Sequence, residues 1–186
     1  MSSDKSTETS QNVRVYTSPA KVNLFLAVCG VREDGFHSLI SLGAPLAFGD
    51  RLEIALDATS SAPDSLRVHG GCDIPVDSTN LVLRAVAAFR QRVPTLGSAH
   101  IELFKEIPSG AGLGGGSSNA ATVLQALNAQ MGQALSAQQL HELGMTLGSD
   151  VPLFMEAVPQ KMWGRGEFLS PVASTLAQRL CGRRLL

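Results

Sequence analysis

The sequence has few cysteines and no excess of charge of either sign, and each of these shortages excludes a class of protein. Its three cysteines, Cys29, Cys72 and Cys181, form no Cys-x-x-Cys pair and leave an odd thiol. This pattern argues against a disulfide framework and against a zinc site. The formal net charge of −1 provides no basic footprint for nucleic acid or an anionic membrane. Any phosphate-bearing ligand must therefore be held by local geometry.

Long hydrophobic runs are also absent. The apolar stretch near residues 22–31 is too short to span a bilayer. Residues 1–12 are polar and rich in serine and threonine, and they contain no apolar core for a signal peptide; Asp4 and Glu8 argue against a transit peptide. We expect a disordered tail over residues 1–12 and a cytoplasmic protein without a membrane or nucleic-acid partner. The oligomeric state is left open.

Glycine, in contrast, is concentrated at one place. Five glycines occur within residues 110–116, between a strand-like run that contains Ile101 and Leu103 and a helix-like run with apolar residues at helical spacing. A loop with so few side chains lets backbone N–H groups approach a ligand closely. A helix that starts directly after the loop points its free N–H groups at the same place, and Ser117, Ser118 or Asn119 are candidate N-caps. This arrangement favours a phosphate ligand.

Several known phosphate loops do not fit this segment. A P-loop requires a lysine, and no lysine occurs between Lys105 and Lys161. The dinucleotide fingerprint matches formally from Gly110 to Gly115, but the acidic residue expected about 20 positions later is missing. The HRD and DFG motifs of protein kinases are absent as well. The loop therefore indicates a phosphate site of another kind.

The first half of the chain predicts strands and turns. In residues 21–28 one face of a strand is fully apolar, because Val22, Leu24, Leu26 and Val28 alternate with the other residues. Asp34-Gly35 predicts a hairpin turn, and Gly49-Asp50 predicts a second turn before a further strand. A short strand is expected at residues 66–68.

Helix signals follow. Asn80 is expected to cap one helix, and Ser136 with Gln139 forms a capping box for another, which Gly148 ends. Antiparallel-looking strands followed by helices predict an α+β domain rather than a doubly wound sheet.

A few polar residues could carry chemistry, each with a plainer alternative. Lys21 and Asn23 lie two apart on one strand, and the plain interpretation is a solvated polar face. Asp150 lies two residues before Pro152 and could be a helix N-cap. His37 follows the hairpin turn, where a lone histidine is usually structural.

Four separated segments resemble, in order, the 4-diphosphocytidyl-2-C-methylerythritol kinases, a branch of the GHMP small-molecule kinases. These segments read SPAKVNLFL, DGFHSL, PSGAGLGGGSSNAA and LGSDVP. The resemblance runs from about Tyr16 to Pro171. It implies an ATP- and Mg²⁺-dependent enzyme of isoprenoid biosynthesis that phosphorylates the 2-hydroxyl of 4-diphosphocytidyl-2-C-methyl-D-erythritol. The metal ligands stay unknown.

The resemblance also implies roles for individual residues. Asp150 would be the catalytic base, and Lys21 would lie beside it and favour the developing alkoxide. Asn23, Phe36 and His37 would hold the substrate, with Phe36 stacking on the cytosine. The segment that would hold the ATP phosphates comprises Pro108, Ser109, Gly110, Ala111, Gly112, Leu113, Gly114, Gly115, Gly116, Ser117 and Ser118.

The resemblance further implies a division of the chain. Residues 13–170 would form the GHMP kinase N-terminal ATP-binding domain, with a ribosomal-protein-like βαβ fold, and residues 171–186 would be an atypical tail. Family members continue into a ferredoxin-like domain, which we expect to be missing here. Two alternatives stay open: an inactive remnant that folds and binds nucleotide, and a dinucleotide-dependent oxidoreductase.

Overall fold

The structure is a computed structural model that describes residues 12–31, 35, 37–60, 62–70, 74–156, 158–164 and 168–172. Nearly all of the expected N-terminal tail and C-terminal tail lies outside these residues. Phe36 also lies outside them, as does the side chain of His37.

Six strands and three α-helices are formed by the described residues. The strands are β1 (Arg14–Val31), β2 (His37–Asp57), β3 (Ser65–His69), β4 (Ser98–Phe104), β5 (Gln160–Gly164) and β6 (Phe168–Pro171). The helices are α1 (Leu81–Arg92), α2 (Gly115–Gln130) and α3 (Ala137–Leu147), followed by a short 3-10 helix, η1 (Pro152–Met155). No helix among the described residues is both long and apolar enough to cross a membrane.

The strands form one mixed sheet in which β2 is the central member. β1 and β2 run antiparallel and meet at Val31 and His37, on either side of the turn that Asp34-Gly35 predicts. The C-terminal half of β2 pairs with β4 and its N-terminal half pairs with β5, both antiparallel. β3 is parallel to β4, and β6 follows β5 at the other end. The expected α+β architecture is confirmed.

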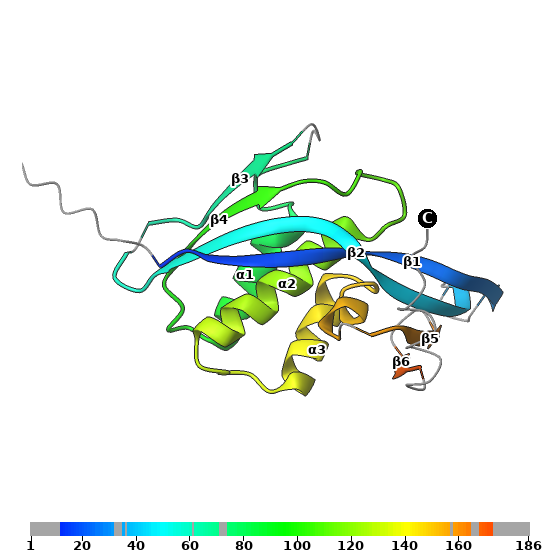
Figure 1. Cartoon of the computed structure of the whole chain (residues 1–186). Coiled ribbons are helices and arrows are strands. Elements are labelled where there is room, and N and C mark those ends of the chain that lie inside the picture. Colours follow the sequence, from blue (N-terminus) through cyan, green and yellow to red (C-terminus); the bar gives the residue numbers. More distant parts are fainter. Residues whose placement is uncertain are drawn as a thin grey trace, which may run out of the picture.

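The three helices lie on one side of the sheet and cover the core (Figure 1). Alternate residues of the central strands face the helices and are buried, such as Leu52 and Ile54 in β2 and Ile101 and Leu103 in β4. Each such side chain contributes about 1.5–3 kcal/mol by leaving water. α2 is buried along most of its length between the sheet, α1 and α3. The segment before α2 therefore joins a rigid element.

Both predicted helix caps outside the glycine loop are confirmed. The Asn80 side chain accepts a hydrogen bond from the Val82 N–H at the start of α1. At the start of α3, Ser136 and Gln139 form the full capping box, and Gly148 is the C-cap. Such caps satisfy N–H groups that have no partner within the helix.

The predicted turn at Gly49-Asp50 is wrong, because β2 continues through both residues. Pro19 pairs with Gly49 and Lys21 pairs with Pro45, so the pairing with β1 is irregular here without reversing the chain. At Gly49 an added Cβ would lie 2.2 Å from the Ser18 carbonyl oxygen. The glycine thus permits a close approach of two strands, and glycine within a strand often has this role.

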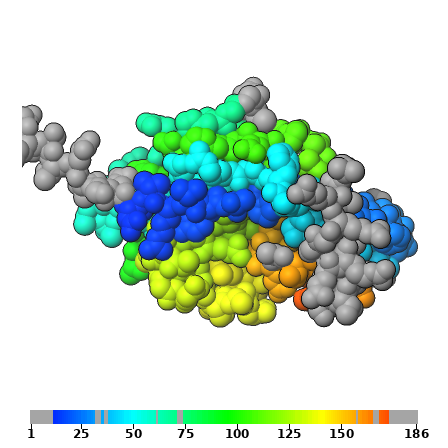
Figure 2. Space-filling view, viewed as in Figure 1, coloured from blue at the N-terminus to red at the C-terminus, as the bar shows by residue number. Residues whose placement is uncertain are grey.

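The apolar face predicted for residues 21–28 is not buried. Leu24, Leu26 and Val28 are 37%, 56% and 62% exposed. The register shifts between Asn23 and Phe25, and Phe25, on the other face of the strand, is 54% exposed as well. In addition, β1 and β2 extend past the helices to the end where β5 and β6 lie (Figure 1). Figure 2 shows β1 along the surface, between β2 above and α2 and α3 below.

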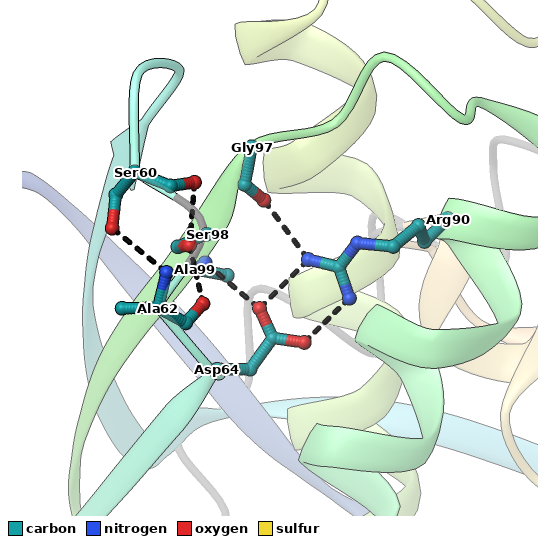
Figure 3. A network of polar contacts seen from close by, with 7 residues as sticks. All are labelled: Ser60, Ala62, Asp64, Arg90, Gly97, Ser98 and Ala99. Atoms are coloured by element: carbon teal, nitrogen blue, oxygen red, sulfur yellow. Dashed lines mark hydrogen bonds and ion pairs between the residues drawn. The ribbon is translucent and has the colours of Figure 1, made fainter.

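At the opposite end of the sheet, an ion pair ties the entry of β3 to α1 (Figure 3). The Arg90 guanidinium donates to both oxygens of Asp64, at 2.5 and 2.7 Å, and to the Gly97 carbonyl. Asp64 also accepts the Ala99 N–H at 2.9 Å. Although burial raises the pKa of Asp64, these hydrogen bonds outweigh it, and the net pKa is lowered. The pair lies away from the glycine loop.

Candidate active site

The glycine-rich loop, residues 108–114, joins β4 to α2 and is largely exposed. Gly110, Gly112 and Gly114 all have φ near +73°, at alternate positions. Side-chain-bearing residues rarely adopt this left-handed conformation. Left-handed residues in a tight turn can direct successive N–H groups into one anion-binding concavity. The loop therefore has the backbone shape that a phosphate site requires.

The loop leads directly into the N-terminus of α2. The N-cap is Gly114, which provides no side-chain hydrogen bond, and the first turn contains no acidic residue. The predicted caps Ser117, Ser118 and Asn119 are therefore wrong. Ser118 and Asn119 are buried and make contacts elsewhere. Because no side chain occupies the first N–H groups, the positive end of the helix dipole is free to face an anion.

Lys21 connects this loop to a carboxylate. Its backbone N–H donates to the Leu113 carbonyl at 2.9 Å, and its Cγ would lie 3.1 Å from a Cβ on Gly114. The Lys21 side chain is buried, and its Nζ donates to Asn23 Oδ1 at 2.5 Å. The same Nζ lies 3.4 Å from Asp150 Oδ2. The plain interpretation of Lys21 as part of a solvated face is therefore wrong.

Asp150 lies in the turn between α3 and η1, and its side chain is 37% exposed. It is not the N-cap of η1, since that position is Val151 and no side-chain cap is present. Asn23 in turn donates from its amide to Ser41 Oγ at 2.9 Å, which fixes its orientation. An exposed carboxylate beside an ammonium group, next to an anion-binding loop, can accept a proton from a bound hydroxyl group.

Two further residues expected to hold the substrate, Phe36 and His37, cannot be placed at this site from the described part of the chain. Phe36 lies outside that part. His37 begins β2 opposite Val31, and its side chain lies outside the described part of the chain. Their position relative to Asp150 stays a prediction.

Sequence reasoning missed a buried polar cluster behind the loop, formed by Ser18, Asp50, Lys105, Ser118 and Asn119. Asp50 is fully buried and forms an ion pair with the Lys105 ammonium group. Asn119 donates to both Asp50 and Ser18. No local pattern marks these residues. A charged residue inside an apolar strand, as Asp50 is before Leu52 and Ile54, is the signal that could have drawn attention to it.

The donors suit a nucleotide phosphate better than a protein-held metal ion. Among the residues that the structure describes, no group of three or more histidine, cysteine, aspartate or glutamate side chains could hold a metal. Mg²⁺ commonly binds through substrate phosphates and one or two carboxylates. The backbone of the loop fits a phosphate group.

The sheet also differs from that of a dinucleotide-binding fold. Among the described strands, only β3 and β4 are parallel, whereas the dinucleotide fold uses a mostly parallel sheet. The loop follows β4, which pairs antiparallel with β2.

Comparison with known proteins finds a family model and several proteins that are similar to this chain. The family described as "GHMP kinases N terminal domain" matches residues 80–157. A 4-diphosphocytidyl-2-C-methyl-D-erythritol kinase from Methylacidiphilum infernorum is 43% identical over 84% of this chain and 54% of its own length. A chloroplastic enzyme of the same name from Oryza sativa subsp. japonica is 40% identical over 88% of this chain and 40% of its own length.

A solved structure agrees with these relatives. The crystal structure of a 4-(cytidine 5'-diphospho)-2C-methyl-D-erythritol kinase is 40% identical, with a TM-score of 0.72 over 86% of this chain and 55% of that chain. The chain thus spans about half the length of the relatives that it matches. Residues 80–157 thus match a GHMP kinase N-terminal domain, and over most of its length the chain is similar in sequence and in fold to the 4-diphosphocytidyl-2-C-methyl-D-erythritol kinases.

Proposed function

We propose that this chain provides the ATP-binding part and the catalytic base of a kinase that phosphorylates the 2-hydroxyl of 4-diphosphocytidyl-2-C-methyl-D-erythritol. The observation that carries this proposal is the position of the Lys21–Asp150 pair beside the glycine loop. The relatives' names support the choice of substrate.

In this proposal residues 108–118 hold the phosphates of ATP. The exposed loop and the uncapped start of α2 supply N–H donors, and no acidic side chain in the first turn opposes the anion. Phosphoryl transfer depends mainly on positioning and on stabilising charge. Mg²⁺ bound with ATP would supply positive charge to the phosphates, and we assign no ligand of this chain to it.

Asp150 then takes the proton from the substrate 2-hydroxyl while the hydroxyl oxygen forms a bond to the γ-phosphorus of ATP. The bond between that phosphorus and the bridging oxygen breaks, and ADP leaves with the electron pair. Lys21 orients Asp150, because its ammonium group lies 3.4 Å from the carboxylate. The same positive charge favours the developing alkoxide.

Asn23, Phe36 and His37 are proposed to hold the substrate. Asn23 is fixed by Lys21 and Ser41, so its amide is already oriented. Stacking of Phe36 on the cytosine and hydrogen bonding by His37 rest on the family resemblance.

The first test concerns the nucleotide. Titration calorimetry of the chain with ATP and Mg²⁺ is expected to give saturable binding, and NAD is expected to give none. Binding of NAD in place of ATP would contradict the proposal and restore the dinucleotide alternative. Inorganic triphosphate, titrated as a third ligand, shows whether the chain recognises the phosphates alone or also the adenosine part of ATP.

The second test concerns the base. A chimera joins residues 1–171 to the C-terminal half of the Methylacidiphilum infernorum relative, so that a full-length enzyme can be assayed. Asp150→Asn is expected to lower kcat by roughly 10²–10⁴, the usual contribution of a general base, with little change in ATP affinity. Lys21→Ala should lose rate in the same way. The control is Asp57→Asn, an exposed carboxylate that only caps a turn; near-full activity of Asp150→Asn would rule out its role as base.

A further inference from the structure

Asp50 receives hydrogen bonds from both sides of the glycine loop. It lies in the middle of β2 and is fully buried. Its Oδ1 accepts the N–H groups of Glu106 and Ile107, each at 2.8 Å. Its Oδ2 accepts the Asn119 amide at 2.8 Å and also the Lys105 ammonium group. One carboxylate therefore contacts the residues that enter the loop and the helix that leaves it.

The contacts continue from Asn119 into β1. The same Asn119 amide donates to Ser18 Oγ at 2.9 Å, and Ser18 Oγ donates to Ser118 Oγ at 2.8 Å. Ser118, Asn119 and Ser18 are all at most 2% exposed. The start of α2 is thus attached to β1 and β2 by side chains, while residues 108–112 of the loop between these attachments are exposed.

We propose that Asp50 is a positioning residue for the phosphate-binding loop. It fixes the distance between the end of β4 and the start of α2, so that the loop's N–H groups are oriented before a ligand arrives. Donors that need no rearrangement bind an anion more tightly, because the ordering cost has already been met in folding. The choice of ligand rests on the proposed function, whereas the ordering of the loop does not.

A carboxylate suits this position better than a neutral side chain. Asp50 accepts hydrogen bonds from four donor groups of the described residues, and a carboxylate is the side chain that only accepts. Burying its charge is costly unless a partner compensates. Lys105 is that partner, and its side chain is 4% exposed. The Lys105 ammonium group would lie 3.0 Å from a Cβ on Gly115, at the first residue of α2.

The competing explanation is that Asp50 only stabilises the fold. Two double variants separate the explanations: Asp50→Asn/Lys105→Met and Asp50→Ala/Lys105→Met. Both remove the buried ion pair, and neither leaves an isolated charge. They differ in one side-chain oxygen. Asparagine keeps an oxygen that can accept hydrogen bonds from the Glu106 and Ile107 N–H groups, and alanine has none. Since Lys105 is absent from both, any direct effect of that lysine on the nucleotide cancels.

Hydrogen exchange of the nucleotide-free protein is the first measurement. Amides of residues 106–114 are expected to exchange at least about tenfold faster in the alanine double variant than in the asparagine one. The second measurement is the ATP dissociation constant, which is expected to be about tenfold higher in the alanine variant than in the asparagine variant. Equal exchange and equal affinity in the two variants would overturn the proposal.

Asp64→Asn is the matched control for stability. Asp64 is also paired with a cation and also accepts a main-chain N–H (Figure 3), but from Ala99 near the start of β4, whereas the glycine loop follows the end of that strand. The Asp64→Asn variant is expected to lower the melting temperature and leave exchange at residues 106–114 and ATP affinity unchanged. A similar loss of affinity in Asp64→Asn would show that affinity follows global stability, which overturns the proposal.

Two further results would still leave the role of Asp50 testable: failure of the alanine double variant to fold, and absence of ATP binding by the wild-type chain. If the alanine double variant does not fold, Asn119→Ala cuts the attachment of α2 while keeping the Asp50–Lys105 pair; unchanged exchange at residues 114–118 then refutes the proposal. If the wild-type chain binds no ATP, the proposed function fails, and the exchange measurement alone decides the role of Asp50.

Discussion

At the scale of single residues, glycines with the same backbone conformation serve different purposes. Gly112, Gly114 and Gly132 all have φ between +70° and +73°. A Cβ on Gly112 or Gly132 would meet nothing within 4 Å, but one on Gly114 would lie 2.8 Å from Phe154 Cζ. Substitution of Gly114 therefore disturbs packing as well as the loop. Gly112 is the better probe of ligand binding.

Gly112→Ala is expected to weaken ATP binding, whereas Gly132→Ala is expected to cost the same stability and leave ATP binding unchanged. Both Gly112→Ala and Gly132→Ala should destabilise by about 1–2 kcal/mol, the cost of a left-handed conformation for a residue with a Cβ. Gly132 lies after α2, at the end of the helix away from the loop. Thermal unfolding should give the same loss for both, and calorimetry should show weaker ATP binding for Gly112→Ala alone. Equal ATP affinities in the two variants would count against the phosphate-binding loop.

At the scale of elements, the connection from α2 to α3 depends on one buried amide. Asn128, in the last turns of α2, accepts the Leu135 N–H at 2.8 Å and donates to the Leu135 carbonyl at 2.9 Å. It also donates to Gln133 Oε1. The side chain thus replaces the hydrogen bonds that the chain loses where it leaves the helix.

Asn128→Ala is expected to destabilise the protein by about 1–3 kcal/mol, because the Leu135 N–H would be left buried without a partner. Gln133→Ala removes only the contact from Gln133 to Asn128 and should cost less than about 0.5 kcal/mol. Urea unfolding of the two variants measures the difference. If they lose equal stability, the Leu135 contacts are not the reason for burying Asn128.

The elements also show what local sequence can predict. The caps at Asn80 and Ser136 depend on residues a few positions apart, and both were predicted correctly. The straight course of β2 through Gly49 depends on its approach to Ser18, which no local pattern contains.

The same limit applies to the candidate site. The glycine loop was evident from the sequence, since its residues are consecutive. The Lys21–Asp150 pair was suggested by family resemblance alone, because the two residues lie on β1 and after α3. The role of Asp50 was missed because its partners, among them Lys105 and Asn119, are distant from it in the sequence.

At the scale of the whole molecule, carboxyl groups with lowered pKa values make the free energy of unfolding depend on pH. The pKa of Asp64 lies below the ordinary 3.8: burial raises it, but hydrogen bonds from Arg90 and the Ala99 N–H lower it further. Hydrogen bonds from Thr59 and Thr79 lower the pKa values of Asp57 and Asp77. A carboxyl group whose pKa is lower in the folded state adds stability above pH 3.8, and that stability is lost as pH falls through the folded pKa.

The melting temperature is therefore expected to fall as pH decreases below about 4, the ordinary range of these groups. Asp64→Asn should be less stable than wild type at pH 7, and the difference should shrink as the pH falls below 3.8. Thermal unfolding monitored by circular dichroism from pH 7 to pH 2 tests this. A difference that stays constant over the whole range would mean that the ionisation of Asp64 does not contribute.

The two partners of β2 impose an order on the growth of the structure. Its C-terminal half pairs with β4, whereas its N-terminal half pairs with β5, which comes after all three helices in the sequence. Contacts between distant segments form late, because the long intervening chain must first be closed into a loop. During synthesis on the ribosome, residues Leu39–Gly43 of β2 therefore keep an unpaired edge until Gln160–Gly164 has emerged. That edge is the place where a nascent chain is open to pairing with the wrong strand.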